Sequence, residues 1–227
     1  MASEALTIPI LQATATAFSR KLSDTLLPDL YGVTDGKAIG TYVEHAFKNA
    51  LSASGYSYDR GNSAHGLDLP SVNTDIKVTS IRQPQSSAPF KSAWQELYGL
   101  GYNLLVFVYD KTDIAHELAA QLKMLHVIYI DEAHTADYRH TRAIRDIVLD
   151  NALDNDAKME QLVAYMEDMR IPIDDYERYN YAQRLIESPP EQGAITISNA
   201  LQWRFGYKTA IRVADERIYP YKVIELG

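Results

Sequence analysis

The sequence predicts an α/β fold in which a mixed central β-sheet is flanked by helices, followed by a C-terminal region with both helices and strands. Three observations support this prediction. Residues 36–54 repeat apolar side chains at helical spacing, residues 74–81 alternate apolar and polar side chains, and residues 103–109 (NLLVFVY) form a nearly continuous apolar run. These patterns are typical of an amphipathic helix, a half-buried strand and a central strand covered on both faces.

The N-terminal part is predicted to be helical at first and β-rich afterwards. Residues 5–30 form a helical segment that ends at Pro28, and residues 36–54 form a second helix that ends before Gly55. Short strands are expected near residues 56, 67 and 76, with a turn at 60–62 and a polar loop at 83–87. A helix at 90–100 precedes the apolar strand at 103–109.

Residues 113–122 are predicted as a crossover helix between the apolar strands 103–109 and 124–130, which makes those strands a parallel pair. Beyond residue 132 the pattern is helical, with one helix from about 154 to before Pro172 and another at 174–186. The tail combines a strand at 195–197, a short helix at 200–203, and two strand-like pieces around Arg212 and Val223.

The chain divides by pattern into three regions: an N-terminal helical arm at 1–35, a core at 36–150, and a C-terminal region at 151–227 packed on the core. A chain of 227 residues is long enough for one sizeable domain. With 22 Lys and Arg against 30 Asp and Glu, its formal charge is −8. This mildly acidic net charge argues weakly against a nucleic-acid-binding protein. An acidic metal site would, however, contribute to the same negative net charge.

The chain has no cysteine, which excludes disulfides, thiolate zinc sites and cysteine nucleophiles. Any metal must therefore be held by oxygen or imidazole ligands. No apolar run approaches the roughly 18 residues of a membrane span, and the N-terminus lacks the basic start of a signal peptide. We expect a cytoplasmic protein with no membrane partner.

The segment that carries chemistry is GLDLPSVNTDIKV, at residues 66–78. Asp75 and Lys77 are two apart on a predicted strand, so their side chains share one face while Ile76 points to the core. Asp68 lies seven residues before Asp75, and the turn-forming residues between them favour a hairpin. The two aspartates are therefore expected to share one cation.

Mg²⁺ prefers oxygen ligands and is usually anchored by one or two carboxylates. Asp68, Asp75 and the backbone carbonyl of Ile76 would supply such a site, with Glu44 as a third carboxylate if it faces the sheet. Lys77 would orient or help deprotonate a metal-bound water, which is a hydrolytic nucleophile, while the metal stabilises charge on a phosphate. Two non-catalytic explanations of these charged residues stay open: a surface ion pair on the strand, and an ordinary Glu44–Lys48 pair on the helix.

Asp68 followed by Asp75-Ile76-Lys77, with Glu44 on an upstream helix, resembles the PD-(D/E)xK nuclease superfamily, and more narrowly its type II restriction endonucleases. The predicted element order over residues 36–131 matches as well, although Leu67 stands where the family name has proline. The resemblance implies a restriction-endonuclease-like core. It implies Asp68 and Asp75 as metal ligands, Lys77 as the water-positioning residue, and Glu44 as a ligand or an orienter of the metal's waters.

The same resemblance implies an activity. It is Mg²⁺-dependent hydrolysis of double-stranded DNA at a specific sequence, with Mn²⁺ able to substitute, leaving 5′-phosphate and 3′-hydroxyl ends in a prokaryotic cytoplasm. Symmetric DNA favours a two-fold protein, so a homodimer is expected. Candidate DNA contacts are Arg82, Gln95, Arg139, Arg142, Arg204, Lys208 and Arg212, since arginine and lysine meet phosphates and arginine can bind guanine edges. Solvated faces that balance acids explain the cationic positions equally well.

Residues 131–134 (DEAH) spell the Walker B box of a helicase family, but the chain has no phosphate-binding loop, so no nucleotide cofactor is expected. Two other functions stay open. One is a DNA repair or junction-resolving nuclease with the same metal site. The other is a non-catalytic DNA-binding or interaction domain in which the acidic cluster is structural.

Overall fold

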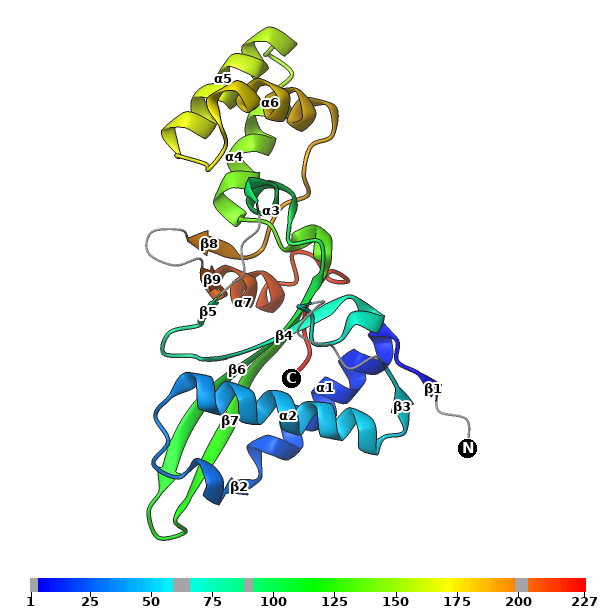
Figure 1. Ribbon diagram of the computed structural model, residues 1–227, viewed down its shortest axis with the longest axis vertical. Helices are drawn as coiled ribbons and strands as arrows, with labels where there is room; N and C mark the ends of the chain where they lie inside the picture. The colour runs from blue at the N-terminus through cyan, green and yellow to red at the C-terminus, as the bar shows by residue number, and fades with distance from the viewer. Residues whose placement is uncertain (1–3, 59–65, 88–91, 199–203) are drawn as a thin grey trace.

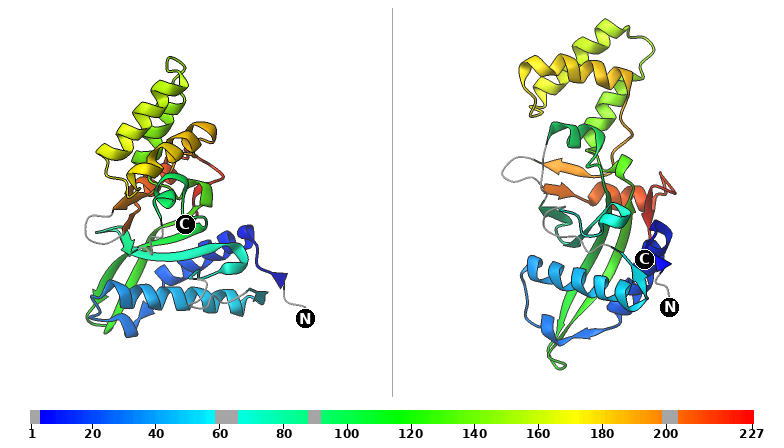
Figure 2. Two further views of the ribbon diagram at one scale, coloured as in Figure 1. Left: turned by 45° about the horizontal axis from the view of Figure 1, so that its top comes forward. Right: turned by 45° about the vertical axis from the view of Figure 1, so that its right-hand side comes forward.

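The computed structural model describes residues 4–58, 66–87, 92–198 and 204–227. The molecule is elongated, with a helical unit of α4 (Tyr138–Val148), α5 (Asn155–Asp168) and α6 (Arg178–Glu187) at one end (Figures 1 and 2). Two long helices, α1 (Ile8–Ser23) and α2 (Gly36–Ala53), lie at the other end. A small sheet and helix α7 (Lys208–Asp215) lie between them, so the fold has three packed parts.

The main sheet has the strand order β10 (Val223–Glu225), β7 (Ala119–Ile130), β6 (Asn103–Ile114) and β4 (Thr74–Ser80), with β2 (Leu26–Leu27) also paired to β7. β4 runs parallel to β6, whereas β6 and β7 form a long antiparallel hairpin. β4 is therefore an edge strand, and the side of its backbone away from β6 is free for other groups. A separate parallel pair joins β1 (Glu4–Ala5) to β3 (Tyr56–Ser57).

Helices α1 and α2 cover one face of the main sheet. Phe18 of α1, Phe47 of α2 and Phe107 of β6 pack with ring centroids 5.2 to 5.7 Å apart, and the buried Ile76 of β4 belongs to the same cluster. Burying one such ring contributes about 1.5–3 kcal/mol. This apolar layer fixes which face of β4 points inward and which points away.

The opposite face of the sheet packs on α7 and on a three-stranded antiparallel sheet of β5 (Gln85–Ser87), β9 (Arg204–Gly206) and β8 (Thr196–Ser198). The helical unit has its own core, which includes Leu97 of α3 (Ala93–Tyr98). Short 3₁₀ turns complete the chain: Pro28–Leu30, Pro70–Val72, Glu132–His134 and Asp175–Glu177.

The predicted mixed α/β class with helices flanking the sheet is confirmed, but two local predictions are wrong. Residues 113–122 are not a crossover helix: they complete β6 and begin β7 around a turn, so strands 103–109 and 124–130 are antiparallel. The parallel partner of β6 is β4. The piece around Arg212 is helix α7, because its apolar residues Ala210, Val213 and Ala214 all face the core.

Smaller differences concern element boundaries. The N-terminal segment contains α1 and two short strands as well as a 3₁₀ turn, the predicted strand near 67 is reduced to a bridge between Leu69 and Thr74, and part of the 83–87 loop is β5. The predicted turn at 60–62 and helix at 200–203 lie outside the described residues. Within the described parts, no helix combines the length and hydropathy needed to cross a bilayer.

Candidate active site

A tight hairpin brings Asp68 next to β4. Leu69 and Thr74 pair as an antiparallel bridge, and the turn between them closes with Asn73 in the left-handed region at φ 46°. The Asn73 side chain donates to the Gly101 carbonyl at 3.0 Å and to Glu132 at 2.7 Å, which stabilises this conformation. Asn tolerates left-handed backbone better than most residues, so the turn agrees with its sequence.

Asp75 and Lys77 project from the face of β4 opposite the core side chain of Ile76, as strand alternation predicts. The Lys77 Nζ lies 2.6 Å from Asp75 Oδ2, and the Asp75 residue is only 4% exposed. The edge position of β4 leaves the Ile76 N–H free to donate to Asp68 Oδ2 at 2.9 Å. The N–H and C=O of one strand residue point to the same side, so the Ile76 carbonyl also faces this edge.

Helix α2 supplies two further charged groups. The Lys48 Nζ lies 2.7 Å from Glu44 Oε1 and 2.7 Å from Asp68 Oδ1, so Glu44 faces the hairpin, as the metal-site prediction required. From the sequence, Lys48 is expected only as a surface partner of Glu44. The four-residue spacing that puts both on one helix face was a signal that Lys48 would point the same way.

The two aspartates titrate as a pair, because their side chains are hydrogen-bonded to each other. Burial raises the pKa of Asp75 to about 6 against the opposing charge of Lys77. Burial also acts on Asp68, but hydrogen bonds from Asp75, Lys48 and the Ile76 N–H outweigh it and lower the Asp68 pKa to about 2. Asp75 is therefore the last of the two carboxyl groups to lose its proton as pH rises.

This donor set fits a divalent cation. Two carboxyl groups that approach each other closely enough to share a proton would repel if both were ionised, and a cation between them would remove that repulsion. The Ile76 carbonyl faces the same edge and adds a neutral oxygen ligand. All donors are oxygens, which favours a hard ion such as Mg²⁺ over a softer one.

A cavity of about 600 Å³ opens beside these groups, between α2, β4 and β5. Its lining is about equally polar and apolar and includes both Lys77 and Glu44. The remaining polar lining side chains are Lys37, Thr41, Gln85, Ser86 and Ser87. A substrate bound in this cavity would contact the Lys77 ammonium directly.

Comparison with known proteins identifies the family. The model of the type II restriction enzyme NspV family matches residues 5–218. The chain is also 49% identical over 211 residues to the type II restriction enzyme NspV of Nostoc sp. (strain ATCC 29411 / PCC 7524), covering 93% of each sequence. The chain belongs to the NspV family of type II restriction enzymes. This membership confirms the restriction-endonuclease resemblance of the sequence; no solved structure matches significantly.

Within this NspV-family fold, the structure separates the predicted DNA contacts into groups. Arg82 and Lys208 line one cavity of about 370 Å³ beside the small sheet, and Arg204 lies on β9 of that sheet. Gln95 lies on α3, where its amide donates to the Leu100 carbonyl, and Arg212 pairs with Glu216 at 2.8 Å. Arg139 and Arg142 are exposed on α4 in the helical unit, at the far end from α2.

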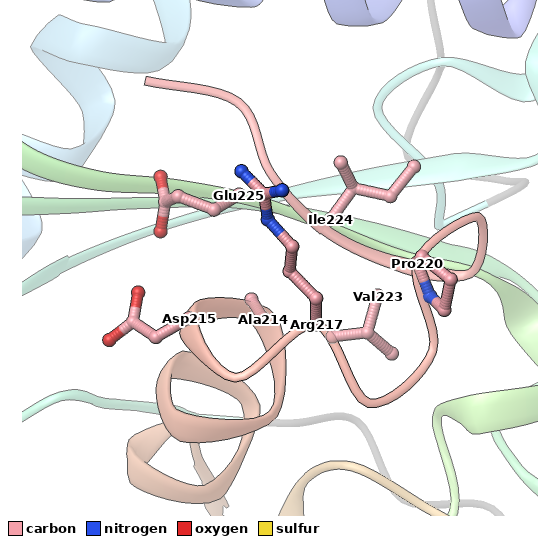
Figure 3. A pocket seen from close by; sticks show the side chains of 7 residues that line it. All are labelled: Ala214, Asp215, Arg217, Pro220, Val223, Ile224 and Glu225. Carbon is pink, nitrogen blue, oxygen red and sulfur yellow. The ribbon is translucent and has the colours of Figure 1, made fainter.

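A second cluster of possible metal ligands lies at the other edge of the main sheet. Asp215 and Glu225 line a cavity of about 450 Å³, and their side chains extend to the same side of it (Figure 3). The His126 Nδ1 lies 3.0 Å from Glu225 and 3.8 Å from Asp215. The hydrogen bond between His126 and Glu225 holds two of the three groups together, and β10 places the cluster at the edge opposite to β4.

The DEAH segment has structural partners in this fold. Asp131 accepts from the Ala133 N–H and pairs with Lys222 at 3.0 Å, while Glu132 accepts from Asn73. His134 stacks on Tyr219 with ring centroids 4.5 Å apart. The segment therefore ties the Asn73 turn to the C-terminal region. Glu132–His134 form a single 3₁₀ turn.

Proposed function

We propose that this protein hydrolyses phosphodiester bonds of double-stranded DNA at a specific sequence, with Mg²⁺ as cofactor, leaving 5′-phosphate and 3′-hydroxyl ends. The observation that supports this most directly is the convergence of Asp68, Asp75 and Lys77 at the edge of β4, beside an open cavity that Lys77 lines. Family membership supports the restriction class, and the donor set supports the divalent cation. The arrangement supports the proposal of a PD-(D/E)xK site, which the sequence also suggested.

Each residue has a distinct role in this proposal. Asp68, Asp75 and the Ile76 carbonyl would hold the cation, and Glu44 would be a further ligand or would orient water. When bound, Mg²⁺, or Mn²⁺ in its place, supplies positive charge that stabilises the phosphate and acidifies nearby water. The Lys77 ammonium, held by Asp75, donates a hydrogen bond to the water or to a phosphate oxygen in the cavity. The buried Asp75 keeps this ammonium in one orientation.

The test is plasmid cleavage by the wild-type protein and the variants Asp75→Asn and Lys77→Ala. Both variants should cleave about 100- to 10,000-fold more slowly because each removes a group from the reacting centre. Lys123→Ala, which removes an exposed ammonium from β7, is the matched control and should retain activity. Circular dichroism of each variant checks that the fold is kept, and the ends are checked by ligation, which requires a 5′-phosphate.

The same digest separates the alternatives. Discrete fragments indicate a restriction enzyme, whereas a smear or branch-dependent cutting indicates a repair or junction-resolving nuclease. Undiminished cleavage in both variants, or full cleavage in the presence of EDTA, would refute the proposed site. Binding of DNA by the wild-type protein without cleavage of any duplex would support the non-catalytic alternative.

A further inference from the structure

The three-stranded sheet has one buried face and one open face. Its register places Gln85, Gly206 and Thr196 side by side, and Ser87, Arg204 and Ser198 in the next row. The residues between these rows point the other way: Phe205 and Ile197 are buried in the core, and Ser86 hydrogen-bonds the buried Tyr207 hydroxyl at 2.6 Å. We call the six residues of the two rows the polar sheet face.

The polar sheet face carries no acidic residue, although the whole chain has a charge of −8. Its side chains are neutral hydrogen-bonding groups together with the Arg204 guanidinium. Arg82 and Lys208 flank it in the adjoining cavity. Within the described residues, Lys208 and Arg204 have no ion pair, and the nearest acidic oxygen to Arg82 belongs to Asp110 at 3.9 Å. Such a surface is complementary to a polyanion that also presents hydrogen-bonding edges.

This face is rigidly coupled to the catalytic strand. Five residues after Ser80 the chain enters β5, and the Thr79 hydroxyl of β4 lies 3.0 Å from both the Gln85 N–H and the Gln85 carbonyl oxygen. The Tyr207 N–H bonds the Pro84 carbonyl at 2.9 Å, which fixes the start of α7 to the same segment. Gln85 lines both the cavity that contains Lys77 and the cavity that contains Arg82 and Lys208. A duplex held at one is therefore held at a defined distance from the other.

We propose that the polar sheet face reads the DNA sequence, with Gln85 and Arg204 contacting base edges and Arg82 and Lys208 contacting the phosphates on either side. Glutamine bonds adenine and arginine bonds guanine in the major groove. Two rows of residues across three strands span about 10 Å across the strands by about 7 Å along them, which fits a groove about 12 Å wide. This assignment rests on the proposed function, since it uses the same bound duplex.

The test begins by mapping the cut site of the wild-type protein and preparing duplexes with each single base-pair change in it. Gln85→Ala should reduce discrimination about 5- to 150-fold at an A·T position and leave other positions unchanged. Arg204→Ala should do the same at a G·C position. Lys208→Ala should weaken binding to all duplexes equally and reduce the salt slope of binding by about 1. Gln12→Ala and Lys123→Ala, which remove an amide and an ammonium elsewhere, should change neither quantity.

Discrimination is also measured by DNA-binding competition without Mg²⁺, so a variant that cleaves poorly is still informative. Unchanged discrimination at every position in both Gln85→Ala and Arg204→Ala would overturn the inference. If Asp75→Asn and Lys77→Ala abolish cleavage in that case, the proposed catalytic site stands and only the reading surface is wrong. If those two variants cleave normally, the proposed catalytic site is wrong whatever the discrimination assay shows. If the wild-type protein cleaves no duplex, the proposed function itself fails.

Discussion

At the scale of single residues, the Lys48 ammonium pairs with a carboxylate oxygen of Asp68 that the proposed metal site needs as a ligand. Its Nζ lies 2.7 Å from Asp68 Oδ1, while Asp68 Oδ2 is held separately by the Ile76 N–H. Removing Lys48 therefore frees one ligand oxygen without releasing the other. We expect Lys48→Met to tighten Mg²⁺ binding in the absence of DNA about fivefold or more, since a unit charge at 4 Å is worth about 1 kcal/mol even in water.

Isothermal titration calorimetry measures this affinity directly. Lys123→Met removes an exposed ammonium from β7 and serves as the control for the change in net charge. Equal or weaker Mg²⁺ binding by Lys48→Met would show that Lys48 supports the ligand geometry and does not compete with the cation.

Glu96 is a buried carboxyl on α3 whose ionisation is unfavourable in the folded protein. It is 2% exposed, its Oε2 has no hydrogen-bond partner among the described residues, and burial together with repulsion from Asp137 raises its pKa to about 7. Because this pKa exceeds the unfolded value of 4.5, the protonated form favours folding. The stabilisation from protonated Glu96 is therefore complete below about pH 4.5 and is lost as pH rises through about 7.

Glu96→Gln removes this titration. We expect the variant to be about 2 kcal/mol more stable than the wild type at pH ~8 and nearly equal at pH ~5, as a shift of this direction and size implies. Urea unfolding at the two pH values measures the difference. If the variant and the wild type differ in free energy of unfolding by the same amount at both pH values, ionisation of Glu96 plays no part.

At the scale of elements, the β6–β7 hairpin shows why one prediction failed. The turn between the strands has no glycine, proline or asparagine, and Leu118 adopts φ 48° while 65% exposed. Without turn-forming residues, the segment was predicted as a helix. Its strand conformation is imposed by eleven paired positions along β6 and β7, which outweigh local propensity.

Leu118 therefore carries a backbone strain that glycine would not. A left-handed conformation costs an L-residue roughly 1–2 kcal/mol, part of which glycine loses again through its greater freedom in the unfolded chain. We expect Leu118→Gly to stabilise the protein by about 0.5–1 kcal/mol. Thermal unfolding provides the measurement, and a lower melting temperature would indicate that the Leu118 side chain makes stabilising contacts.

At the scale of the whole molecule, charge is unevenly distributed. The chain is acidic overall, yet the polar sheet face and its flanking Arg82 and Lys208 carry no acid. On the proposal above, an anionic duplex would be attracted to this side more than the net charge of the chain suggests, which would orient it on approach. One copy presents one candidate catalytic site, so cutting both strands of a symmetric sequence requires two copies or two binding events.

We accordingly predict a homodimer, at least on DNA, because a two-fold protein matches a symmetric duplex. Sedimentation velocity with and without a duplex that contains the mapped cut site tests this. A complex containing one protein chain per duplex at saturation, together with a monomer in free solution, would contradict the prediction.

Features that depend on neighbours along the chain could be predicted from the amino-acid sequence alone. Asp75 and Lys77 share a face because a strand alternates every two residues, and Glu44 and Lys48 share one because a helix repeats about every 3.6. Other features depend on the tertiary structure. Lys48 reaches Asp68, and β6 pairs antiparallel with β7. Gln85, Gly206 and Thr196 lie side by side in one row of the small sheet. Those arrangements are stabilised by long-range packing and strand pairing between segments distant in sequence, and no local periodicity encodes which distant segments meet.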